Sequence, residues 1–202
     1  MKTPFAPRLT PTRAQGLDTW AVIVAGAERC LVRDGMAGLT TRNVAAAAGV
    51  GVGTVYRYFP NVEAIAIAVI DRLVGADVAA VMPVLEAAPE LPIDVWTREL
   101  VMALMDTHRR EHTLRAVMFS NRTLISERWR QAEQATVDAV TAVLRAHPDT
   151  FALPALELKA LMLVYAIEAA VDAAVLRPPA DDEVAVAVLV AMIRAGLAGA
   201  PT

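Results

Sequence analysis

The stretch "LTTRNVAAAAGVGVGTVYRYFPN", residues 39–61, decides the fold. Its two halves, 40–49 and 52–58, each have the pattern of a short helix. Thr40 offers a hydroxyl to the free N–H groups of the first helical turn, and Gly49 tolerates the positive φ at which such a helix ends. Two short helices joined by a tight turn predict a helix-turn-helix, whose second helix enters the DNA major groove.

The second of these helices carries the side chains expected of a DNA reader. Val55 and Phe59 stand four apart and predict its inward face. The remaining polar positions supply hydrogen-bond donors suited to phosphates and, for arginine, to guanine: Thr54, Tyr56, Arg57 and Tyr58. Gly51 and Gly53 leave the helix start bare, so that the backbone can approach a phosphate. The alternative is a core helix with a polar edge, although two tyrosines and an arginine on one face are costly there.

Composition bounds the class of protein. The chain has 202 residues, of which 56% are apolar, yet its longest uninterrupted apolar run covers only residues 184–193. A membrane-spanning helix needs about 20 apolar residues. The first residues contain prolines and no apolar segment typical of a secretory signal, and the single cysteine, Cys30, predicts no internal disulfide. We therefore expect a cytoplasmic protein without a membrane partner.

Charge is unevenly distributed along the chain. Residues 1–62 hold seven basic and three acidic side chains, a net charge of +4, and the remaining residues have a net charge of −7. A basic N-terminal part on an acidic remainder predicts that the N-terminal part faces a polyanion.

Helical periodicity runs through the whole chain, and no stretch alternates in the two-residue rhythm of a strand. The sequence therefore predicts an all-α fold: an N-terminal three-helix helix-turn-helix DNA-binding domain and a larger α-helical ligand-binding and dimerisation domain. Nine helices are expected in total, with the fourth ending before Pro83. Their ranges are 18–34, 40–49, 52–58, 62–82, 93–108, 111–119, 124–146, 155–176 and 182–198.

Residues 23–65 also carry a family resemblance. The helix ending at Gly35, the segments "LTTRNVA", "AGV" and "GTVYRYF", and Glu63 together resemble the DNA-binding domain of the TetR family of bacterial transcriptional regulators. The resemblance implies a homodimer that binds a palindromic double-stranded DNA operator, usually repressing until a small-molecule effector enters the C-terminal domain.

The resemblance assigns DNA contacts position by position. Thr41 would meet a phosphate and Arg42 a base or a phosphate. The full predicted DNA-binding set is Thr40, Thr41, Arg42, Gly51, Val52, Gly53, Thr54, Tyr56, Arg57 and Tyr58. Val62 stands where the family usually has a lysine, and the loss of one cation should flatten the salt dependence by about one unit of slope. Arg57 and the basic residues of the N-terminal arm are the candidates to compensate.

The domain boundaries follow from these assignments. We expect a flexible basic arm over residues 1–16, the helix-turn-helix domain over 17–62 with its motif at 40–59, and the ligand-binding and dimerisation domain over 63–202. The last two predicted helices, 155–176 and 182–198, are apolar almost all the way round and need covering on every side. A second copy of the chain is the expected cover, in a four-helix bundle; the alternative is that both helices are central in a monomer.

Candidate pocket residues lie between these two regions. Methionine and aromatic side chains line adaptable apolar cavities, and a few polar groups orient a ligand, although the same residues are ordinary core in most helical proteins. The candidates are Trp96, Met102, Met105, His108, Met118, Phe119, Arg122, Trp129, Tyr165 and Glu168.

Neither catalysis nor metal binding is expected. His108 and His112 have the spacing of two zinc ligands but lack the H-E-x-x-H order, and no nucleophile–base set or phosphate loop stands out. We predict no enzyme activity, no cofactor and no metal.

The predicted function is a repressor released from DNA by a small, largely apolar ligand. One alternative is a DNA-binding regulator of the same build that activates, or that responds to a protein or to no effector. Another is a helical small-molecule-binding protein or enzyme that has lost DNA binding, which a salt-dependent gel shift would distinguish.

Overall fold

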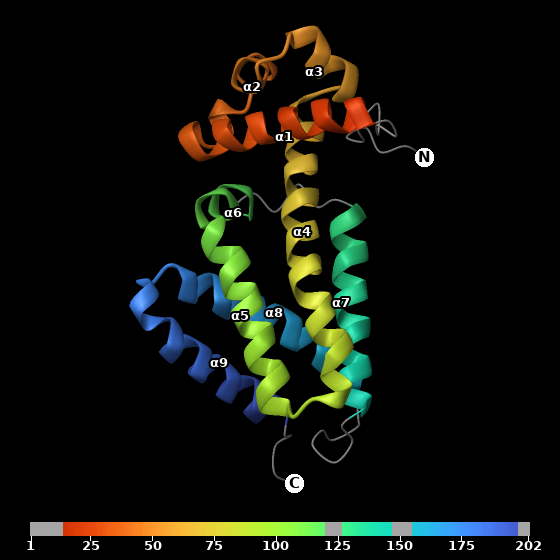
Figure 1. Ribbon diagram of the computed structural model, residues 1–202, viewed down its shortest axis with the longest axis vertical. Helices are drawn as coiled ribbons and strands as arrows, with labels where there is room; N and C mark the ends of the chain where they lie inside the picture. The colour runs from red at the N-terminus through yellow and green to blue at the C-terminus, as the bar shows by residue number, and fades with distance from the viewer. Residues whose placement is uncertain (1–13, 120–126, 147–154, 198–202) are drawn as a thin grey trace. The chain divides into compact units, whose positions relative to one another are not determined.

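The computed structural model describes residues 14–119, 127–146 and 155–197. These residues form nine α-helices and three short 3₁₀ helices, and no strand occurs among them (Figure 1). The predicted all-α architecture is confirmed. The chain divides into two compact units, which we describe separately: the first comprises residues 1–73 and 113–129, and the second residues 74–112 and 130–202. The predicted functional boundaries after residues 16 and 62 stay a prediction, and residues 1–13 of the predicted arm lie outside the described residues.

Local sequence signals set the helices of the first unit. Its elements are α1 (Ala14–Asp34), α2 (Thr41–Ala48), α3 (Val52–Tyr58), the start of α4 (Val62–Ala87) and nearly all of α6 (His112–Phe119). Thr40 caps α2 by accepting a hydrogen bond from the Asn43 N–H at 3.1 Å, and Asn61 Oδ1 accepts from the Ala64 N–H at 2.9 Å. Gly35 and Gly49 have φ values of 65° and 67°, which glycine adopts without strain.

The core of the first unit closes around Phe59, which is fully buried and stacks on Trp20 with ring centroids 4.3 Å apart. Ile23 and Leu31 of α1 and Val55 of α3 are equally buried. Burial of each such side chain contributes about 1.5–3 kcal/mol. This core holds α3 against α1 and leaves the opposite side of α3 exposed.

A close approach between α1 and α2 depends on Gly26. A Cβ atom added there would lie 2.9 Å from the backbone nitrogen of Ala48, closer than real Cβ contacts allow. Gly26 therefore lets α1 and α2 meet at a contact that a methyl group would block.

The prediction that the fourth helix ends before Pro83 is wrong. α4 runs from Val62 to Ala87 with Pro83 inside it. Pro83 and Ala79, whose carbonyl loses its partner, are both exposed, so water can satisfy the carbonyl. Beyond the proline, Leu85 is 2% exposed and packs in the core of the second unit. Burial of this side chain offsets the cost of the missing hydrogen bond.

The second unit is a helical bundle with one continuous apolar core. The rest of α4 is joined by α5 (Ile93–Arg110), α7 (Glu127–Ala146), α8 (Leu156–Val175) and α9 (Asp182–Leu197). α8 and α9 are consecutive antiparallel helices, and α5 packs against both (Figure 1). No helix among the described residues is long and apolar enough to cross a lipid bilayer.

Candidate nucleic-acid interface

The turn between α2 and α3 places two helix ends at one surface. Gly49 is in the left-handed conformation, and the Val50 N–H donates to the Ala45 carbonyl at 3.0 Å, which closes α2. α3 then begins after Gly51 in extended backbone, a conformation open to any residue. Gly51, Val52 and Gly53 are all exposed. The predicted helix-turn-helix is therefore present, and the first turn of α3 faces solvent.

Two hydroxyl groups converge on this surface. Thr41 Oγ1 of α2 and the Tyr56 hydroxyl of α3 are 3.2 Å apart and share a hydrogen bond. Tyr56 is 45% exposed, and Thr41 is half-buried. The hydroxyl that accepts within this pair keeps its own hydrogen, so the pair can donate one hydrogen bond to a phosphate oxygen while the two helices stay linked.

Thr41 and Tyr56 are each followed in sequence by an arginine. Arg42 and Arg57 are exposed, and the Arg57 guanidinium lies 5.0 Å from the ring centroid of Tyr58 and donates to its hydroxyl at 3.2 Å. Thr40 is exposed but occupied as the cap of α2, and Thr54 is half-buried.

The prediction that Tyr56 and Tyr58 share one face is wrong. Tyr58 is 3% exposed, and its ring meets Trp20 edge-on with centroids 6.4 Å apart. Residues two apart on a helix point about 200° from each other, so one of the two tyrosines must face the core. Of the two tyrosines in the predicted DNA-binding set, only Tyr56 has an exposed ring.

Other basic residues of the first unit serve its fold. Arg29 donates to the Ala47 carbonyl at 2.5 Å, and Arg72 pairs with Glu28. The Arg33 guanidinium pairs with Asp34 at 2.6 Å, and this hydrogen bond lowers the pKa of the Asp34 carboxyl. The net charge of residues 1–62 already counts Glu28 and Asp34, so these pairings leave it unchanged.

The predicted pocket residues are not gathered into one place. Trp96, Met105 and His108 are buried in the second unit, while Met118 is buried in the first. Met102 and Tyr165 are about half exposed, and Glu168 is also exposed. Arg122 and the side chains of Phe119 and Trp129 lie outside the described residues.

His108 has structural partners on two neighbouring helices. Its Nδ1 is 2.7 Å from Asp172 Oδ1 of α8, and its Nε2 is 3.8 Å from Asp77 Oδ1 of α4. The two carboxylates lie at opposite ring nitrogens and cannot share a metal ion with the imidazole. Within the described ranges, no group of three or more His, Cys, Asp or Glu residues has the arrangement of a metal site.

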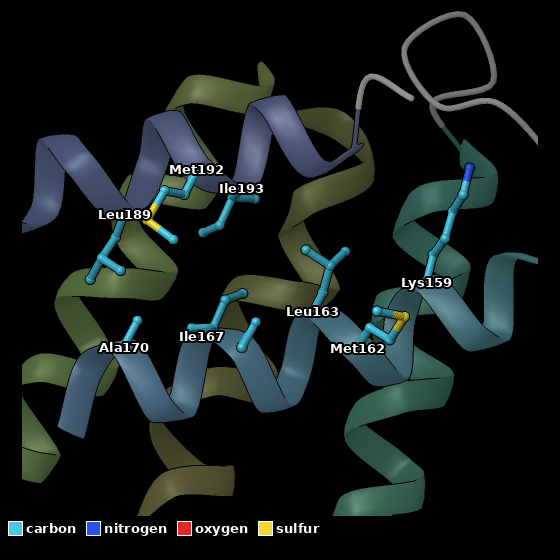
Figure 2. Close-up of a pocket in the computed structure, with 9 residues that line it drawn as sticks. Lys159, Met162, Leu163, Ile167, Ala170, Leu189, Met192 and Ile193 are labelled. Carbon is cyan, nitrogen blue, oxygen red and sulfur yellow. The ribbon is translucent and has the colours of Figure 1, made fainter. Parts of the chain in front are cut away.

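Sequence reasoning missed a groove between α8 and α9 of about 270 Å³ (Figure 2). Apolar side chains from both helices line it, with Lys159 at one end: Met162, Leu163, Ala166, Ile167, Ala170, Leu189, Met192 and Ile193. Large apolar side chains are also exposed along the same two helices: Leu158, Met162, Tyr165, Val184, Val188 and Met192. The signal was present in the apolarity of both helices, but periodicity could not show which face stays uncovered.

Comparison with known proteins gives two family matches. Residues 23–69 match the model of bacterial regulatory proteins of the tetR family, and residues 92–197 match a tetracyclin repressor-like C-terminal domain. No curated protein matches the chain.

Solved structures share the fold over most of the chain. A putative transcriptional regulator from Pseudomonas aeruginosa PAO1 superposes with a TM-score of 0.71 at 19% identity, covering 94% of each chain. A regulatory protein in the tetR family from Rhodococcus RHA1 gives 0.69 at 21% identity, covering 91% of this chain and 98% of its own. The fatty acid degradation regulator FadR from Bacillus halodurans gives 0.66 at 19% identity, covering 90% and 95%.

Proposed function

The chain belongs to the TetR family of bacterial regulatory proteins, and from this premise we propose that it is a transcriptional repressor. It binds a palindromic DNA operator as a homodimer and leaves the operator when a small, largely apolar ligand binds. The observation that carries the DNA-binding part is the exposed surface of α2 and α3, where the Thr41 and Tyr56 hydroxyls meet 3.2 Å apart.

The first turn of α3 supports close contact with DNA. A Cβ at Gly53 would meet nothing within 4 Å, and one at Gly51 would meet only the Thr54 hydroxyl at 3.9 Å. The chain's own packing therefore does not require glycine at either position. Glycine would be required if a binding partner came close to the backbone here. A DNA phosphate at the start of a helix is such a partner.

Exposed apolar side chains support dimerisation through α8 and α9. Met162 and Tyr165 of α8 are 64% and 50% exposed, and Val188 and Met192 of α9 are 51% and 57% exposed. Large exposed apolar patches mark interaction sites. A twofold-related copy would cover these two stripes with the same two stripes, as an isologous interface requires.

The ligand part follows from the family premise and from the core of the second unit. That core is built from aliphatic side chains of α4, α5, α7, α8 and α9, with Trp96 and Met105 among them. A ligand that enters such a core must be largely apolar, because an uncompensated polar group would lose its hydration there. A ligand can bind more tightly to a dimer whose two recognition helices are spaced differently from the DNA-bound dimer. The ratio of its affinities for the two forms is then the factor by which it weakens DNA binding.

Selection from a randomised duplex library tests the DNA-binding part. We expect enrichment of an inverted repeat, because a dimer places two recognition helices about 34 Å apart in successive major grooves. Binding of the selected duplex should weaken steeply as salt rises. Absence of any enriched sequence would favour the alternative, a small-molecule-binding protein that has lost DNA binding. Val62, in place of the usual lysine, is the residue that motivates this alternative.

A further inference from the structure

We infer that Arg109 is a positioning residue that fixes the angle of the α8–α9 hairpin and thereby the geometry of the dimer. This inference rests on the proposed dimerisation through α8 and α9. Arg109 lies at the end of α5, and its side chain is 24% exposed.

The guanidinium of Arg109 reaches both ends of the hairpin turn. Its Nη1 donates to the Val175 carbonyl at 3.2 Å and to the Arg177 carbonyl at 3.0 Å, where α8 ends. Its Nη2 donates to the carboxylate of Asp182, the first residue of α9. One side chain therefore joins the last turn of α8 to the first turn of α9.

This arrangement uses the chemistry of both helix ends. The last carbonyls of a helix have no partner within it and carry partial negative charge, which a cation stabilises. An aspartate stabilises the opposite pole, at the start of a helix. Arginine offers five donors in a rigid fork, so it can serve two carbonyls and a carboxylate together, whereas lysine is a flexible point charge.

The neighbouring residue holds the same helix one turn earlier. His108, which is 1% exposed, bonds through Nδ1 to Asp172 of α8 at 2.7 Å. α5 thus contacts α8 at two successive points. It contacts α9 near its start and also near its end, where Arg194 and Asp94 form an exposed ion pair at 3.1 Å. The segment between the helices is short and contains Pro178 and Pro179.

The angle set at this turn matters most at the open end of the hairpin. α8 has 20 residues and spans about 30 Å, so a small rotation at its end moves its start by several ångströms. The apolar stripes of α8 and α9 form one surface only at a particular angle. Loss of the Arg109 contacts should therefore weaken the dimer while the helices themselves remain.

The test compares Arg109→Gln with Arg98→Gln. Arg98 also joins α5 to α9, but through a single exposed ion pair with Glu183 at 2.9 Å. Sedimentation velocity over a dilution series gives the dimer dissociation constant. We expect Arg109→Gln to raise it about tenfold or more, as the loss of charge-assisted hydrogen bonds does. Arg98→Gln should stay within about threefold of the wild type.

A distance measurement separates positioning from general stability. Spin labels at Glu157→Cys and Ala195→Cys, both exposed at the open end of the hairpin, report its angle within one chain when excess unlabelled protein is added. Cys30 is 1% exposed and need not be replaced. The wild type and Arg98→Gln should give one narrow distribution, and Arg109→Gln a broadened or shifted one.

Several outcomes would overturn the inference. An Arg109→Gln protein that dimerises like Arg98→Gln contradicts it, whatever its melting temperature, and so does an unchanged distance distribution. If Arg109→Gln does not fold, Arg109→Lys decides by the same two readouts, because it keeps the charge and loses the fork. A wild-type monomer at micromolar concentration contradicts the proposed dimer instead, and the distance measurement then tests the hairpin angle alone.

Discussion

The two units of this chain are specified in different ways. In the first, single residues with local roles set each helix boundary, such as Thr40 as a cap and Gly49 as a left-handed end. In the second, α8 and α9 are long apolar helices whose boundaries carry few such signals; α8 begins after Ala155 without a side-chain cap. In the first unit, caps and glycines set the helix ends that shape the proposed DNA-binding surface. In the second unit, apolar side chains form the core, and those left exposed on α8 and α9 form the proposed dimer surface.

The largest loss of stability should come from removing a buried side chain from the core of one unit while the core of the other unit stays intact. Phe59→Ala removes a fully buried ring from the first unit and should cost about 3–5 kcal/mol of its stability. Leu144→Ala does the same in the second unit, at a cost of about 2–5 kcal/mol. Hydrogen exchange should show the loss of protection confined to the mutated unit. Equal loss in both units would mean that they unfold as one.

A charge on the uncovered face should break the dimer. Val188→Asp places a carboxylate on an α9 side chain that is 51% exposed in one chain, so the monomer tolerates it. In the dimer the carboxylate would lose its hydration, and we expect dimerisation to become less favourable by about 2–4 kcal/mol. Val22→Asp is the matched control, since Val22 is 43% exposed on α1. Light scattering should show monomers for the first variant and dimers for the second.

A smaller effect distinguishes two glycines of the first unit. Gly26→Ala forces α1 and α2 apart, because its methyl group would lie 2.9 Å from the Ala48 backbone, and should cost about 1–3 kcal/mol. Gly53→Ala meets open space and should stabilise the isolated chain by about 0.5–1 kcal/mol. Thermal melting measures both. Gly53→Ala should also weaken DNA binding. Unchanged DNA affinity would contradict the argument that the missing side chain at Gly53 lets a phosphate approach the backbone.

The smallest effect on DNA binding comes from single hydroxyl groups on α3. Tyr56→Phe should weaken specific and non-specific DNA binding alike by about 1 kcal/mol, the size of one hydrogen bond. Tyr58→Phe loses a hydroxyl that pairs with Arg57 and should leave DNA affinity closer to the wild type. Fluorescence anisotropy at two salt concentrations measures both. If the two variants lose equal DNA affinity, Tyr58 contributes to DNA binding as much as Tyr56 does, although its ring is buried.

These comparisons also show what could be read from the sequence. The helix-turn-helix was predictable because caps, glycine ends and the Val55–Phe59 spacing are local signals. The continuation of α4 through Pro83 was not, because it depends on burial of Leu85 among residues far away in sequence. The burial of Tyr58 could have been predicted from its two-residue distance to Tyr56.

The groove and the Arg109 contacts were beyond sequence reasoning for another reason. Apolarity on all sides of α8 and α9 predicts that something covers them, but it cannot assign faces. Contacts such as those from Arg109 to Val175 and Asp182 join residues more than sixty positions apart. Such pairings follow from how helices pack, and a single sequence does not encode them visibly.

The composition of the protein–DNA complex is the measurement that matters most. Sedimentation velocity of the wild type with its selected duplex, at low and moderate salt, gives both the number of chains bound and the affinity. We predict two chains per duplex, an affinity that falls steeply with salt, and loss of the complex in Val188→Asp. One chain per duplex with full affinity, or binding that ignores salt, would contradict a dimer that reads DNA through α2 and α3.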